Sequence, residues 1–148
     1  MTDLSLRPAF TDHFAEEYRL ERLDPRGVGA AARFRLYGRG RWMDTAIEEA
    51  ERPHLVREHG RGGRENLVDA FTVWELAEGA SAQGCEATVT FWTEPQTLIG
   101  RLRERGLHRR LRRDWKRALV RLRDIAEEGR TVERVTVGGG ERLPAFAR

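Results

Sequence analysis

The stretch CEATVTFWTE, residues 85–94, and the helical pattern that follows Pro95 decide the fold. In the first, Cys85, Ala87, Val89 and Phe91 alternate with mostly polar residues, which predicts a strand with one apolar face. In the second, Gly129 is a stop signal for a long amphipathic helix, and Gly106 allows either two helices or one kinked helix. The apolar stripe of that helix consists of Leu111, Trp115, Ala118, Leu119, Leu122, Ile125 and Ala126.

Further strands are predicted upstream of residue 85. Phe14 to Leu23 and residues 28–37 predict two strands joined by the turn DPRG at 24–27. Residues 41–51 follow Gly38-Arg39-Gly40, which we interpret as a hairpin turn. Their propensity alone also allows a short helix, but neighbouring strands favour a strand. Residues 54–78 predict a hairpin with Gly60, Gly62 and Gly63 at its turn, and residues 79–84 a loop. The series predicts an antiparallel meander.

A chain of 148 residues suits one domain. We predict an N-terminal extension over residues 1–13, a folded domain over 14–128 and a tail over 129–148. The tail contains a short β-like piece, Thr131 to Val137, before a glycine triplet.

Composition predicts a cytoplasmic protein without a metal or cofactor. Cys85 is the only cysteine, no Cys/His group has zinc-site spacing, and neither a membrane span nor a signal pattern occurs. The net charge of +3 does not require a nucleic-acid partner, and no specific nucleic acid is expected. No Gly-x-Ser-x-Gly elbow is present, which disfavours hydrolase chemistry.

The segment Arg101 to Arg123 is strongly basic, with ten arginines and Lys116 against Glu104 and Asp114. We interpret it as the solvated outer face of the helix. The alternative is an interaction module, in which the pocket is filled and this face contacts an anionic membrane surface or an acidic partner.

Several antiparallel strands followed by one long helix resemble the helix-grip fold of the START-like superfamily, also labelled SRPBCC. The residues that carry the resemblance are Gly27 to Phe34, the step Glu51-Arg52-Pro53-His54-Leu55-Val56, and GCEATVTF at 84–91. They are similar to the actinobacterial polyketide cyclase/dehydrase branch over about residues 14 to 128. The resemblance implies an α+β fold in which a curved antiparallel sheet wraps the C-terminal helix.

Members of that superfamily usually begin with a strand and a pair of short helices. Only thirteen residues precede Phe14, so these elements are expected to be missing or the start to be truncated. We expect either that Thr131 to Val137 returns along the free edge beside CEATVTFWTE, or that a homodimer covers that edge. Monomer and homodimer both stay open.

A space between sheet and helix predicts binding or carriage of a small hydrophobic molecule, such as a lipid, a polyketide or an aromatic metabolite. Ordinary core packing is the alternative for every lining residue. The predicted lining residues are Phe34, Met43, Ile47, Phe71, Val73, Val89, Phe91, Leu111, Trp115 and Leu119.

The alternative function is an enzyme of the polyketide cyclase/dehydratase type, which would use the same space. It requires polar groups pointing inward. The candidates are Asp44, His54 and Asp69. A solvated carboxylate or a rim histidine is the more common role for such residues, so the sequence favours binding over catalysis.

Overall fold

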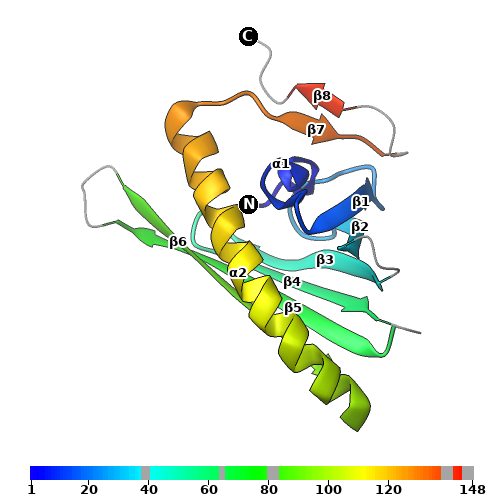
Figure 1. Cartoon of the computed structure of the whole chain (residues 1–148). Coiled ribbons are helices and arrows are strands. Elements are labelled where there is room, and N and C mark those ends of the chain that lie inside the picture. Colours follow the sequence, from blue (N-terminus) through cyan, green and yellow to red (C-terminus); the bar gives the residue numbers. More distant parts are fainter. Residues whose placement is uncertain (38–40, 64–65, 80–83, 138–141, 145–148) are drawn as a thin grey trace.

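Six antiparallel strands form one sheet in this computed structural model, which describes residues 1–37, 41–63, 66–79, 84–137 and 142–144. Each strand pairs with its neighbours in the chain, so the sheet is a meander, and a long helix covers one face of it (Figure 1). The predicted α+β class and helix-grip layout are confirmed. The strands are β1 (Ala15–Leu20), β2 (Ala31–Leu36), β3 (Arg41–Glu51), β4 (Leu55–Gly62), β5 (Val68–Glu78) and β6 (Cys85–Pro95).

Strand β6 confirms the alternation that its sequence predicts. It pairs with β5 from Cys85 opposite Glu78 to Pro95 opposite Val68. Val89 and Phe91 are half-buried beneath the helix, whereas Thr88 and Thr90 are exposed. Strand β3 likewise resolves the choice for residues 41–51 in favour of a strand. The predicted turn at 38–40 and residues 80–83 of the predicted loop lie outside the described residues.

Helix α2 (Leu98–Glu128) is a single helix. It begins where the Thr97 hydroxyl accepts a hydrogen bond from the Gly100 amide at 3.1 Å, and it ends at Gly129, whose φ of 61° is left-handed. Gly106 lies on the exposed side of this helix and does not break it. No helix among the described residues is long and apolar enough to cross a membrane.

Two short helices precede β1, so the expectation that helices are missing there is wrong, whereas no named strand precedes them among the described residues. They are η1 (Leu4–Leu6) and α1 (Pro8–Thr11). The Asp3 carboxylate accepts the Ser5 amide at 3.0 Å and starts η1, and Pro8 opens α1. Leu4 and Phe10 are buried in the core, so these residues belong to the packed fold.

The tail returns to the opposite edge of the sheet from the one predicted. Strand β7 (Glu133–Val135) pairs with β8 (Arg142–Pro144), and Val137 bridges Leu20 of β1. The expectation that residues 131–137 lie beside β6 is wrong. The reason is the 31-residue length of α2, which starts after β6 and carries the chain diagonally across the sheet to α1 (Figure 1).

Two glycines predicted at a hairpin turn lie inside β4 instead. Gly60 pairs with Ala70 and Gly62 with Val68, and only Gly63, with φ of 80°, belongs to the turn. The backbone of β3 explains Gly60, because a Cβ there would lie 1.8 Å from the carbonyl oxygen of Asp44. A close approach between strands therefore requires this glycine.

Candidate functional site

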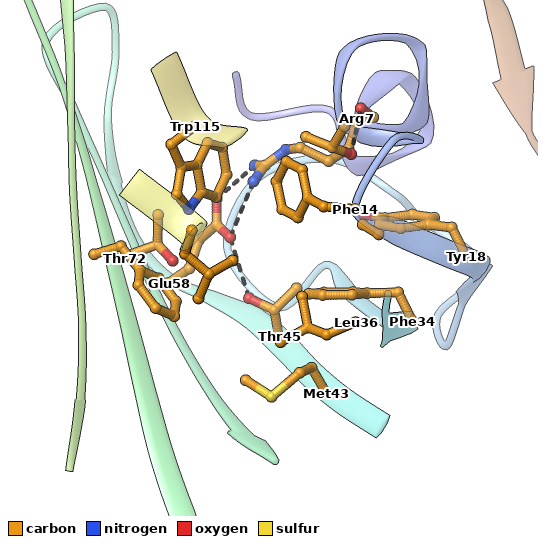
Figure 2. Close-up of a pocket in the computed structure, with 14 residues that line it drawn as sticks. Arg7, Phe14, Tyr18, Phe34, Leu36, Met43, Thr45, Glu58, Thr72 and Trp115 are labelled. Carbon is orange, nitrogen blue, oxygen red and sulfur yellow. Dashed lines mark hydrogen bonds and ion pairs between the residues drawn. The ribbon is translucent and has the colours of Figure 1, made fainter. Parts of the chain in front are cut away.

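A small cavity lies between the sheet, the N-terminal segment and α2 (Figure 2). Its volume is about 40 Å³, which is room for roughly one to three water molecules. Its surface is almost entirely apolar, although polar groups stand in its wall. The lining residues are Arg7, Thr11, Phe14, Ala15, Tyr18, Phe34, Leu36, Met43, Thr45, Glu58, Thr72, Phe91, Leu111 and Trp115.

A buried ion pair joins the N-terminal segment to the sheet at this cavity. Arg7 contacts both carboxylate oxygens of Glu58, with Nη2 at 2.5 Å from Oε1 and Nη1 at 3.3 Å from Oε2. Both side chains are at most 7% exposed. Burial by itself would lower the pKa of Arg7, but the charge of Glu58, the hydrogen bond to it and the nearby Tyr18 together outweigh this effect, so the pKa is raised.

Further donors saturate the Glu58 carboxylate. Trp74 Nε1 donates to Oε1 at 2.9 Å and Thr45 Oγ1 donates to Oε2 at 3.1 Å. The Arg7 guanidinium also lies 4.7 Å above the Trp74 ring. With donors on both oxygens, this carboxylate anchors the N-terminal segment and is not poised as a free general base.

Two polar groups of the cavity wall lack a partner among the described residues. They are the Tyr18 hydroxyl, on β1, and the Trp115 indole N–H, on α2, and both atoms are buried. The Tyr18 ring stacks on Phe34, with the ring centroids 5.8 Å apart. An unpaired buried donor gains a hydrogen bond when a polar atom enters beside it. The cavity can thus orient a polar end of a bound molecule.

We expect Tyr18→Phe to raise the free energy of unfolding by about 1 kcal/mol, because a buried unpaired hydroxyl is destabilising. Burial also raises the pKa of Tyr18, so wild-type stability falls as the pH rises above about 10, where the unfolded tyrosine ionises first. The Tyr18→Phe variant should lose less stability than wild type in this pH range. Urea unfolding at pH 7.5 and 10.5 measures both effects.

Tyr37→Phe is the control for this prediction. The Tyr37 hydroxyl donates a hydrogen bond to Asp114 at 2.6 Å, so removing it should lower the free energy of unfolding. Equal destabilisation of both variants would contradict the assignment.

A larger groove lies beside the cavity, between β6 and α2. Its volume is about 530 Å³, which is within the roughly 300–1,000 Å³ of small-molecule sites. Phe91, Leu111 and Trp115 line both spaces and form the wall between them. The full lining consists of Ala87, Thr88, Val89, Thr90, Phe91, His108, Leu111, Arg112, Trp115, Lys116 and Leu119.

Most of the predicted lining residues meet at these two spaces. Phe34 and Met43 line the cavity, Val89 and Leu119 line the groove, and three residues line both. Ile47 is buried in the core and lines neither of them. The shared residues are Phe91, Leu111 and Trp115.

The placement of Phe71 and Val73 in this lining is wrong, because they lie on the other face of the sheet. Phe71 stacks between His59 and Trp92, with ring centroids 4.8 Å and 5.0 Å away. The inward positions of β5 are taken by Thr72 and Trp74, both buried. The hydrogen bond from the Trp74 indole to Glu58 holds this face of β5 toward the cavity.

The three catalytic candidates do not form a polar cluster in the cavity. Asp44 pairs with Arg33 at 2.9 Å on the outer face, with both side chains about two-fifths exposed. His54 is exposed in the turn between β3 and β4. Asp69 accepts a hydrogen bond from His59 at 3.3 Å on the outer face, and this bond lowers the pKa of Asp69. The geometry required for a cyclase is therefore not provided by these residues.

The outer face of α2 is basic, as its sequence predicts. Among the described residues between 98 and 123, the one acidic side chain on this helix is the buried Asp114, which Tyr37 and two arginines contact. The partner of this face stays a prediction. The exposed cations are Arg101, Arg105, Arg109, Arg110, Arg112, Arg113, Lys116, Arg117 and Arg123.

Sequence reasoning missed the polar groups of the cavity: Arg7, Tyr18, Thr45 and Glu58. One of them carried a local signal, because Glu58 shares the inward alternation of β4 with Val56. Arg7 carried none, since its partner is 51 residues away. Nothing in its neighbourhood predicts burial.

No group of three or more His, Cys, Asp or Glu side chains within the described part of the chain is arranged to hold a metal ion. Comparisons of the chain with protein-family models, with curated proteins and with solved structures found no match. The geometry of the cavity and groove is therefore the basis for any functional assignment.

Proposed function

We propose that this protein binds a small, mainly apolar molecule in the groove between β6 and α2. The observation that carries the proposal is the groove itself, about 530 Å³ in volume with Val89, Phe91, Trp115 and Leu119 in its lining. The inner cavity alone, at about 40 Å³, is too small for a lipid or a polyketide.

The cavity gives the groove an inner end with directional chemistry. Trp115 lines both spaces, and its N–H is buried with no partner among the described residues. Displacement of this side chain would join the two spaces, because it lines both, and would bring the Tyr18 hydroxyl within reach of a ligand. A carbonyl or hydroxyl oxygen on the ligand would accept from these donors.

Binding of the neutral fluorescent probe N-phenyl-1-naphthylamine tests the proposal. We expect one saturable site per chain. Leu119→Trp fills the groove and should weaken probe binding by about tenfold or more, since each 1.4 kcal/mol of lost contact changes affinity tenfold. Native mass spectrometry of the purified chain would show a stoichiometric adduct as independent support.

Val120→Trp is the matched control, because Val120 is 48% exposed on α2 and does not line the groove. It adds the same ring at the neighbouring position and should leave probe affinity unchanged. Absence of saturable binding, or equal binding by wild type and Leu119→Trp, would reject the groove as a ligand site.

A further inference from the structure

Two cations stand at the groove one helical turn apart. Arg112 and Lys116 are exposed on α2 and line the groove together with Leu111, Trp115 and Leu119. Residues four positions apart lie on the same side of a helix, so both cationic groups can contact the same functional group of a ligand. Their stems continue the apolar wall while their heads remain at its mouth.

Among the residues that the structure describes, no acidic side chain lines the groove to balance these charges. Neither Arg112 nor Lys116 forms an ion pair with any residue that the structure describes, whereas other cations of α2 do. Arg110 and Arg113 lie near Asp114, for example, and Arg121 pairs with Asp12. The positive charge of the groove is therefore free to meet a charge on the ligand.

The opposite wall of the groove is β6, the edge strand of the sheet. The side chains of Thr88 and Thr90 alternate onto the exposed face of this strand, so these residues contribute backbone N–H and C=O groups of the free edge to the groove. Backbone amide donors opposite a guanidinium and an ammonium suit a compact oxyanion. The floor between them, with Val89 and Phe91, suits an apolar tail.

We infer that the ligand is a single-tailed anionic amphiphile, whose carboxylate head lies between Arg112 and Lys116 and whose tail lies along Val89, Phe91 and Leu119. This inference rests on the proposed function and specifies its ligand class. The arginine fork can hold a carboxylate through two parallel hydrogen bonds, and the lysine adds a point charge. The tail is buried beside the Trp115 wall.

Competition against N-phenyl-1-naphthylamine with decanoate and decan-1-ol, which share one chain length, tests the head-group assignment. We expect wild type to bind decanoate about tenfold more tightly than the alcohol, because hydrogen bonds to charged groups contribute roughly 1.5–3 kcal/mol. Arg112→Gln/Lys116→Gln should remove this preference and leave the affinity for decan-1-ol unchanged. The preference should also shrink as salt is added.

Arg109→Gln/Arg117→Gln is the matched control, since both side chains are exposed on α2, neither lines the groove, and the change in net charge is identical. It should keep the preference for decanoate. If the control variant loses the preference to the same extent as Arg112→Gln/Lys116→Gln, the preference arises from the overall positive potential of the helix, and the head-group site is rejected. Equal displacement by acid and alcohol also rejects it, but leaves the proposed function standing. Failure of the probe itself to bind rejects both.

Discussion

Glu58→Leu is expected to lower the free energy of unfolding by about 3–5 kcal/mol, which is the usual loss when one partner of a buried ion pair is removed. The substitution leaves the Arg7 guanidinium buried without its counter-charge. It also removes the acceptor for Trp74 Nε1 and Thr45 Oγ1. Urea unfolding followed by circular dichroism measures the loss, which is a large share of a typical total of about 5–15 kcal/mol.

The double variant Arg7→Leu/Glu58→Leu separates the effect of charge from that of packing. Because neither charge is then buried alone, its stability should lie within about 2 kcal/mol of wild type. The coupling between the two positions follows from the four unfolding free energies of the cycle. Additive losses in the double variant would show that the two side chains contribute independently and that the ion pair is not the anchor of the N-terminal segment.

Gly60→Ala is expected to destabilise the fold by about 3 kcal/mol or more, at the upper end of overpacking effects, because its new atom meets main chain. The added Cβ would lie 1.8 Å from the Asp44 carbonyl oxygen and 2.8 Å from the carbonyl carbon. Neither atom can move away without separating β3 from β4. Thermal and urea unfolding both report the change.

Gly62→Ala provides the comparison on the same strand. A Cβ there would lie 1.9 Å from Met43 Sδ, in a flexible side chain that can rotate away, and its nearest main-chain atom would be the Trp42 carbonyl oxygen at 3.1 Å. Its effect should be about 1–2 kcal/mol, clearly smaller than that of Gly60→Ala. If Gly60→Ala is tolerated as well as Gly62→Ala, the two strands are not in the described register.

The parts of the fold that sequence predicted have local patterns. Alternating apolar and polar residues predict β6, and the apolar stripe predicts α2; each pattern lies within a single element. The helices η1 and α1 were missed because three and four residues are too few for helical periodicity. Their positions depend on contacts with distant residues, such as that of Arg7 with Glu58.

The candidate site likewise contains residues that a local pattern predicts and residues whose position depends on distant contacts. Strand β5 has large apolar residues on both faces, with Phe71 and Val73 on one and Trp74 and Leu76 on the other, so alternation alone does not choose the inward face. The choice follows from hydrogen bonding of Trp74 to a carboxylate on β4. By contrast, one helix stripe places both Leu111 and Trp115 on the side of α2 that faces the sheet, and both line the cavity and the groove.

The pairing of the tail with the N-terminal segment has a consequence for the order of folding during synthesis. Arg134 lies 3.7 Å from Asp3, and Val137 bridges Leu20, so residues from both halves of the chain close this edge together. Such distant contacts form late, because a long loop must be ordered first. On the ribosome, the sheet emerges well before residue 137. The segment η1–α1, which carries Arg7 to the cavity and against which β7 packs, therefore gains its final cover last.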